Sequence, residues 1–407
     1  MSLSTMRSRQ LHNVSEDRET LSRRNKRSKT SLNGHIPIDL LIEIFLKLPV
    51  KSIATCRSVS KFWTYVLGRQ DFTELFLTKS SSRPQLLFAC ANDNGYFFFS
   101  SNQPQNLDEN SSPIAAYPLT HVPKSRDLGP PINGLVSLRG ERILKGRIRP
   151  VDVSIIYNPS TGESLTLPKT NMTRKKIYTV TSFLGYDPIE KQYKVLSMNM
   201  SYEKHPKCEG YQVLTLGTGK LSWRMIKCCL NYQHPLKNSE ICINGVLYYL
   251  AMVNGSSWPT RAVVCFDIRS EMFNFMEVYR ELSYTTTLIN YNNGKLGMLM
   301  GQEAHKTISG ICRSFELWVL EDTVKHEWSK HVYLLPPLWK DAVANTRLYF
   351  AGMIGTSEIV LFRPDEPLCV FYYNIDRNTI KRVGIRGLEA FKYFRIFLNH
   401  VENVKLF

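Results

Sequence analysis

The sequence lacks cysteine spacing that would indicate a metal site. Its 407 residues include nine cysteines, and none lies in a C-x-x-C pair. Cys228 and Cys229 are adjacent, too close together to clasp one ion, while His205 and Cys208 have no second pair to accompany them. An odd number of scattered cysteines is typical of reduced, mostly buried thiols in a cytosolic or nuclear protein. We therefore expect no disulfide framework, no metal and no cofactor.

Long apolar runs are also missing. No stretch approaches the roughly 18 apolar residues that a membrane-spanning helix needs. The polar N-terminus contains no apolar core of the kind found in secretory signal peptides. These two absences predict a protein of the nucleus, the cytoplasm or both, with no membrane partner.

The common catalytic motifs are absent as well. The sequence contains no Gly-x-Ser-x-Gly, no Gly-x-x-x-x-Gly-Lys and no His-Glu-x-x-His. Residues 217–220, Gly-Thr-Gly-Lys, lie between two expected strands and lack the helix that would hold a phosphate. Lys227 precedes Cys228 and Cys229, but no His is indicated as a partner for a cysteine nucleophile. The sequence therefore predicts a protein that is not an enzyme.

Acidic residues are few relative to basic ones, and the formal net charge is +17. Residues 1–33 hold eight Lys/Arg against three acidic residues and are poor in apolar side chains, which predicts a disordered basic tail. The cluster at residues 23–29 is either a nuclear-import signal or part of a solvated tail. The remaining positive charge is spread along the chain, whereas a nucleic-acid binder concentrates it on one face, so this pattern disfavours nucleic acid as a partner.

Residues 34–80 have the pattern of a small helical unit. Pro37 suits the first turn of a helix that continues through Leu40, Leu41, Ile44, Phe45 and Leu48 and ends at Pro49. A second short helix is expected from Ser52. A third, capped by Ser58 or Ser60, carries Phe62, Trp63, Val66 and Leu67 and ends at Gly68. Three short helices bury little apolar surface, so the unit is expected to need a partner for stability.

Residues 85–407 have the pattern of an all-β domain, in which two kinds of unit recur. The first is an aromatic-rich strand, an Asp/Asn or Gly turn and a second strand. Its copies are residues 155–162, 185–191, 214–219, 264–269, 318–322 and 371–376. The second is a turn centred on Asn-Gly or Gly, followed by a short apolar strand. Asn-Gly indicates a type I′ turn, because such a turn needs positive φ at both central residues. Its copies are residues 132–136, 243–248, 292–296 and 354–359.

The spacing of the first unit favours a propeller. Phe266, Leu320 and Tyr373 occupy equivalent places in successive copies, about 50 residues apart, as expected for four-stranded, kelch-like blades. About six blades would fit. A large β-sandwich has the same local pattern but gives no reason for the repeat. The predicted fold is thus an α+β multidomain chain in which a small three-helix unit precedes a large all-β domain of propeller type.

Residues 36–53, Ile-Pro-Ile-Asp-Leu-Leu-Ile-Glu-Ile-Phe-Leu-Lys-Leu-Pro-Val-Lys-Ser-Ile, closely resemble the F-box of plant proteins. Residues 57–63, Arg-Ser-Val-Ser-Lys-Phe-Trp, continue the resemblance, which is long and specific. Two departures are Ile36, where the family usually has Leu, and residues 54–56, Ala-Thr-Cys, where larger side chains are usual. The second departure would soften the small core without removing the partner-binding face.

The rest of the chain resembles the plant F-box-associated domain. The matching stretches are Tyr-Asn-Pro-Ser-Thr-Gly at 157–162, Gly-Tyr-Asp-Pro at 185–188, Trp-Arg at 223–224, Ile-Asn-Gly-Val-Leu-Tyr-Tyr at 243–249, Cys-Phe-Asp at 265–267, Trp-Val-Leu-Glu-Asp at 318–322 and His-Val-Glu-Asn at 400–403. Together the two resemblances cover nearly everything after residue 35. They imply an adaptor that binds a Skp-family linker, and through it a cullin, at its F-box, and holds a target protein for ubiquitination at its β domain.

The family likeness implies an apolar helical surface for the linker. The candidates for linker contact, or for direct support of it, are Pro37, Leu40, Leu41, Ile44, Leu48, Pro49, Val59 and Trp63. Some of them must also form the core of the small unit. We expect Pro37, Leu40, Ile44 and Pro49 to be contacts and Trp63 to be a core residue.

The target-binding residues are not identified by the sequence, although strand-joining loops are their expected place. Trp258 and Trp339 lie in two such loops, as either exposed anchors or residues packed in their own blades, and packing is the more common outcome. Residues 174–176, Arg-Lys-Lys, attract an acidic target or are simply solvated. Two further hypotheses remain: a protein- or glycan-binding propeller scaffold outside any ligase, and a propeller enzyme such as a copper oxidase.

Overall fold

We describe a computed structural model of the chain. The residues that it describes are 36–104, 113–143, 146, 148, 151–170, 179–201, 207–217, 219–228, 232–253, 260–278, 286–301, 307–344, 346–363, 367–391 and 393–405. They form two compact units, with the division between Leu48 and Pro49. The basic tail, the cluster at residues 23–29, Arg174–Lys176, His205, Cys229 and Trp258 lie outside the described residues.

The helices expected from the sequence are present. They are α2 (Ile38–Phe45) in the first unit, and α3 (Val50–Val59) and α4 (Lys61–Gly68) in the second. Helix α3 begins directly after Pro49, two residues before Ser52, since a proline can precede a helix without losing a needed N–H. Ser60 caps α4, where its hydroxyl accepts a hydrogen bond from the Trp63 N–H at 3.1 Å.

A further helix, α5 (Gln70–Ser81), was not predicted. It buries Phe72 and Phe76, which lie one helical turn apart with ring centroids separated by 6.1 Å. Most of its other positions are polar, so two buried rings gave too short an apolar pattern to recognise. Helices α3, α4 and α5 are called the helical group below.

The β domain contains six sheets, named here by the order of their strands. The first sheet is β26 (Tyr393–His400), β1 (Gln85–Asn92), β2 (Gly95–Asn102) and β4 (Tyr117–Pro123); the second is β5 (Ser125–Arg126), β6 (Val136–Arg142), β7 (Val151–Tyr157) and β8 (Ser164–Thr166). The third is β9 (Thr179–Asp187), β10 (Gln192–Ser201), β11 (Lys207–Thr215) and β12 (Arg224–Ile226); the fourth is β13 (Tyr232–Ile243), β14 (Val246–Val253), β15 (Thr260–Asp267) and β16 (Phe273–Val278).

The last two sheets complete the domain. The fifth is β17 (Thr286–Tyr291), β18 (Lys295–Gly301), β20 (Ser314–Asp322) and β21 (Glu327–Leu334). The sixth is β22 (Arg347–Ile354), β23 (Glu358–Arg363), β24 (Cys369–Asn374) and β25 (Thr379–Arg386), with the short strands β19 (Thr307–Ser309) and β3 (Ile114–Ala115) at its two edges. Helix α6 (Trp339–Val343) lies in the connection between the fifth and sixth sheets.

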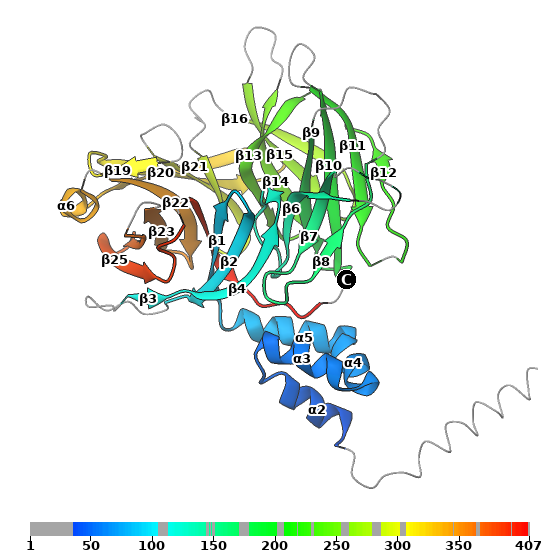
Figure 1. Ribbon diagram of the computed structural model, residues 1–407. Helices are drawn as coiled ribbons and strands as arrows, with labels where there is room; N and C mark the ends of the chain where they lie inside the picture. Colours follow the sequence, from blue (N-terminus) through cyan, green and yellow to red (C-terminus); the bar gives the residue numbers. More distant parts are fainter. Residues whose placement is uncertain are drawn as a thin grey trace, which may run out of the picture. The chain divides into compact units, whose positions relative to one another are not determined.

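The six sheets form a closed six-bladed propeller (Figure 1). Neighbouring sheets contact each other around the ring: β2 lies against β5, β6 against β9, β13 against both β9 and β11, β17 against β13, β22 against β17 and β26 against β22. The ring closes within the first sheet, where the last strand, β26, pairs antiparallel with the first, β1. The prediction of a propeller is therefore confirmed, and the sandwich is excluded.

The two recurring units of the sequence occupy equivalent places in the blades. Phe266, Leu320 and Tyr373 lie on β15, β20 and β24, which are the third strands of successive sheets. The Asn-Gly units are turns between first and second strands. At Asn133 and Gly134 φ is 47° and 81°, as a type I′ turn requires. The repeat of about 50 residues is thus the length of a blade.

The chain after β26 returns to the second blade instead of leaving the domain. Residues 401–405, called the C-terminal strap, run along this blade and pass beside α5 (Figure 1). Asn403 is buried and lies between two turns of the second blade. Its side-chain amide donates to the Asn133 carbonyl at 2.5 Å, and its own carbonyl accepts from Nδ2 of Asn158 at 2.8 Å. Two of the stretches that resemble the F-box-associated domain, 157–162 and 400–403, therefore contact each other.

Candidate functional site

Helix α2 presents an apolar face to solvent. Leu40 and Ile44 are 49% and 47% exposed and lie one turn apart on the same side of the helix. Pro37, immediately before the helix, is also exposed. A soluble helix usually buries its apolar side chains, so exposed leucine and isoleucine in a row indicate a surface that a partner covers.

The opposite side of α2 is buried. Leu41 is 6% exposed, and Ile42 and Phe45 are buried with it. Leu41 was named among the candidates for contact or support, and it is buried. Leu48, three residues after the helix, is half-buried. The sequence named the apolar positions correctly, but helical spacing alone did not separate those that face the interior from those that face solvent.

The helical group carries exposed apolar side chains of its own. Val59, at the end of α3, is 61% exposed, and Pro49 before α3 is exposed too. Trp63 is half-buried, between the core and contact roles considered for it. The group also exposes Phe62 and Tyr65 on α4, which were not named as candidates for contact. Phe62 was taken as part of an apolar helix face, and the aromatic character of Tyr65 was the signal that could have identified it.

Of the two expected target loops, the one at residues 335–339 lies within the described ranges. Trp339, in the connection after β21, is 2% exposed, and its indole N–H donates to the Ser309 carbonyl at 2.7 Å. It is therefore a packed residue and not an exposed anchor. The residue before it, Leu338, is 70% exposed. Of these two neighbouring residues, the leucine is exposed and the tryptophan is buried.

The described thiols do not gather into a metal-binding group. The eight cysteines in the described ranges are free, and burial raises the pKa of Cys90 and of Cys265 to about 12. At neutral pH such thiols stay protonated and are poor nucleophiles and ligands. No three His, Cys, Asp or Glu side chains come together to hold a metal ion in the part of the chain that the structure describes. Among the same residues, no helix is long and apolar enough to cross a membrane.

One open cavity of about 530 Å³ lies at the edge of the sixth blade. Its lining is mostly apolar, including Leu388 and Phe394, with Arg386 and Glu389 as the charged groups. The carboxylate of Glu389 accepts hydrogen bonds from the Gly387 N–H at 2.9 and 3.0 Å, so it serves the local turn. The cavity contains no pair of groups suited to acid–base chemistry.

Comparison with known proteins agrees with a helical segment followed by a β-propeller. Residues 34–75 match the family description "F-box domain", and residues 85–404 match "F-box associated beta propeller domain". The F-box protein DOR of Arabidopsis thaliana is 51% identical over 98% of this chain and 100% of its own length. A second F-box protein of Arabidopsis thaliana is 48% identical over 97% of both chains.

Solved structures are similar only at a distance. The β-propeller domain of the Trilobed protease from Pyrococcus furiosus aligns with a TM-score of 0.35 and 14% identity, over 64% of this chain and 70% of that chain. A likeness at this level has no bearing on function.

Proposed function

Because the chain belongs to the F-box proteins that carry an F-box-associated β-propeller domain, we propose that it is the target-recognition subunit of a Skp–cullin–F-box type ubiquitin ligase. It binds a Skp-family linker through the F-box and holds a target protein on the propeller. It contributes no catalytic group itself. Its effect is to raise the local concentration of the target beside the ubiquitin-charged enzyme.

The observation that carries this proposal is the exposed apolar face of α2. Leu40 and Ile44 lie on the solvent side of the helix, with Pro37 before it. Buried apolar anchors at protein interfaces typically contribute about 2 kcal/mol or more each. Within the second unit, Pro49 and Val59 are exposed and Trp63 is half-buried. Leu41 and Leu48 support the segment without being principal contacts.

The test is co-purification with a recombinant Skp-family linker. Leu40→Ala combined with Ile44→Ala should weaken linker binding by roughly a thousandfold, because two anchors of about 2 kcal/mol each are lost. The matched control is Ile189→Ala combined with Val324→Ala, since both of these apolar side chains are exposed on the propeller. The control should bind the linker like the unchanged chain.

Each other outcome has a definite meaning. Retained binding by the Leu40/Ile44 variant would remove α2 as the contact face. If the unchanged chain does not bind any Skp-family linker, the ligase role itself is wrong and a propeller scaffold outside a ligase replaces it. The circular dichroism spectrum and melting temperature of each variant separate lost binding from lost folding.

A further inference from the structure

The C-terminal strap joins the helical group to the propeller. On the propeller side Asn403 is held by Asn133 and Asn158, as described above. Lys405 extends the contact to the third blade, where its ammonium group lies 4.6 Å from the centre of the Tyr193 ring. The Asn403 side chain also accepts from the Lys405 N–H at 2.7 Å, which fixes the direction of the strap.

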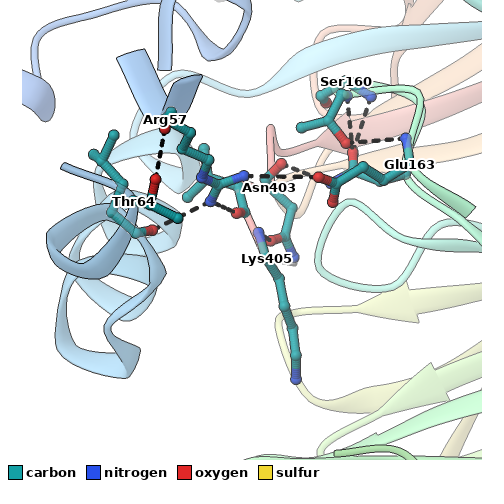
Figure 2. Close-up of polar contacts among 10 residues, drawn as sticks. Arg57, Thr64, Ser160, Glu163, Asn403 and Lys405 are labelled. Atoms are coloured by element: carbon teal, nitrogen blue, oxygen red, sulfur yellow. Dashed lines mark hydrogen bonds and ion pairs between the residues drawn. The ribbon is translucent and has the colours of Figure 1, made fainter. Parts of the chain in front are cut away.

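On the other side the strap contacts two helices. The guanidinium of Arg57, on α3, donates to the Val404 carbonyl (Figure 2). The Glu402 N–H donates to the hydroxyl of Ser80, on α5, at 2.7 Å. A short run of backbone thus contacts two helices and two blades, although it is about 320 to 350 residues away from those helices in the sequence.

Arg57 is the centre of this joint. Its guanidinium also donates to the Leu67 carbonyl of α4 at 3.2 Å and lies 4.0 Å from Oε1 of Glu163 on the second blade. Burial lowers the pKa of Arg57, and the nearby Glu163 only partly offsets this. Because burial removes water from the guanidinium, its hydrogen-bond acceptors must come from the protein. Arg57 therefore favours the arrangement in which the Leu67 carbonyl, the Val404 carbonyl and the Glu163 carboxylate all lie beside it.

The backbone of Arg57 is held as well. The hydroxyl of Thr64 donates to the Arg57 carbonyl at 2.6 Å and contacts the Ser60 carbonyl at 3.0 Å, so α3 and α4 are tied together beside the guanidinium (Figure 2). The backbone of Arg57 is thus held by α4, and its guanidinium is held by the strap. A rotation of the helices relative to the propeller would break the hydrogen bond between Arg57 and the strap.

Contacts at the periphery are weaker. Lys51 donates to the Pro118 carbonyl at 3.1 Å, and Lys191 pairs with Glu74 at 2.6 Å. Both contacts are exposed, and an exposed ion pair such as Lys191–Glu74 typically contributes about 0–1 kcal/mol. The hydrogen bond of Lys51 is also weak, because water competes for both of its groups. They limit the motion of the helices less than Arg57 and the strap do.

We propose that Arg57 and the C-terminal strap fix the angle between the helical group and the propeller, and so limit the directions in which a target on the propeller can face a linker that contacts Val59 of the helical group. Arg57 is in this sense a positioning residue. The effect on target position rests on the proposed function. The rigidity of the joint does not, because it is a property of this chain alone. Transfer by proximity depends on where the target lysine is held, so a loose joint would spread the target over many positions.

The rigidity is measured by the distance between two spin labels in the full chain. The labels are placed at Thr78 on α5 and Val324 on the fifth blade, both exposed, with genetically encoded amino acids that leave the native cysteines unlabelled. The unchanged chain should give one narrow distance distribution. Arg57→Ala should replace this narrow distribution with a broad one. Arg69→Ala is the matched control, since Arg69 pairs with Asp71 at the start of α5 and should leave the distribution narrow.

Positioning is measured in the ligase reconstituted with linker, cullin, RING protein and conjugating enzyme. The propeller lysines that become ubiquitinated are mapped by mass spectrometry. The unchanged chain and Arg69→Ala should be modified at the same restricted set of lysines, and Arg57→Ala at a wider set with linker binding unchanged. A broadened distance distribution with an unaltered set of lysines would show a purely structural joint and overturn the positioning role.

Two further outcomes are decisive. A narrow distribution in Arg57→Ala would overturn the inference whether or not the linker binds, whereas absence of linker binding by the unchanged chain overturns only the proposed function. If Arg57→Ala does not fold, Ser80→Ala replaces it, because that change removes only the hydroxyl that receives the Glu402 N–H. A distribution as narrow as that of the unchanged chain in Ser80→Ala would then count against the strap.

Discussion

Asn158 and Asn403 are 245 residues apart in sequence, and the side-chain amide of the first donates to the backbone carbonyl of the second at 2.8 Å. Both residues are buried. The Asn158 Oδ1 atom also accepts from the Ser160 and Thr161 N–H groups, at 3.0 and 3.3 Å. One side chain therefore shapes its own turn and holds the C-terminal strap against the second blade.

Asn158→Ala is expected to reduce the free energy of unfolding by about 2–3 kcal/mol, because it leaves buried hydrogen-bonding groups without their partner. The matched control is Asn374→Ala. Asn374 closes a similar turn by accepting from the Arg377 N–H at 2.9 Å, but it does not serve the strap. Its loss should cost less than about 1 kcal/mol. Urea denaturation followed by tryptophan fluorescence gives both values, and equal costs would contradict the role of the strap.

Gly134→Ala should destabilise the same contact from the opposite side. Gly134 has φ of 81°, and a Cβ added there would lie 2.4 Å from the Val401 carbonyl oxygen. Gly355 is the control, with φ of 60° and no atom within 4 Å of an added Cβ. Gly355→Ala should cost about 1 kcal/mol for its backbone conformation, and Gly134→Ala more than about 2 kcal/mol because the strap must also move. Similar urea midpoints for the two variants would show that the strap can move away from the added Cβ without loss of stability.

The stability of the protein should depend on pH through His400, the last residue of β26. This imidazole is buried, and desolvation lowers its pKa to about 4. The unfolded chain takes up a proton near pH 6.5 whereas the folded chain does not, so stabilisation is complete above pH 6.5 and is lost as the pH falls toward 4. The loss is on the order of 3 kcal/mol.

The measurement for His400 is a series of urea midpoints between pH 4 and pH 7.5. Carboxylates also titrate in this window, so the difference between variants is what counts. His400→Met should flatten the dependence below pH 6.5, while His331→Gln, which changes an exposed histidine, should leave it unaltered. If the profiles of all three chains are parallel, groups other than His400 cause the pH dependence of stability.

Substitutions at Trp339 and Leu338 should have very different effects on stability, although the two residues are neighbours. Trp339→Phe removes the donor to the Ser309 carbonyl and reduces a buried side chain, which should cost about 3 kcal/mol. Leu338→Ala should change stability by less than about 0.5 kcal/mol, since the side chain is exposed. Thermal melts of the two variants decide the point. A stable Trp339→Phe variant would mean that this tryptophan is not needed for packing.

Much of the architecture was predictable because it depends on short-range patterns. The turn at residues 132–136 and the strand that contains Phe266 were recognised from turn chemistry and alternation, and both lie where the repeat predicted. Helix α5 was missed because only Phe72 and Phe76 mark its buried side. At Trp339 the sequence left packing and exposure open, because burial depends on what the neighbouring strand and helix place over the ring.

The sequence alone determined the F-box, the repeat of the blades and the turns between their strands, since each of these is specified by residues close together in the chain. The resemblance to the F-box also led us to expect Leu40 and Ile44 as contacts, whereas their exposed fractions of 49% and 47% were decided by the fold. The role of Arg57 and the C-terminal strap emerged only from the tertiary structure. Ring closure by β26 and β1 brings the end of the chain back beside the second blade and the helices, and a contact made across hundreds of residues leaves no periodic trace in the sequence.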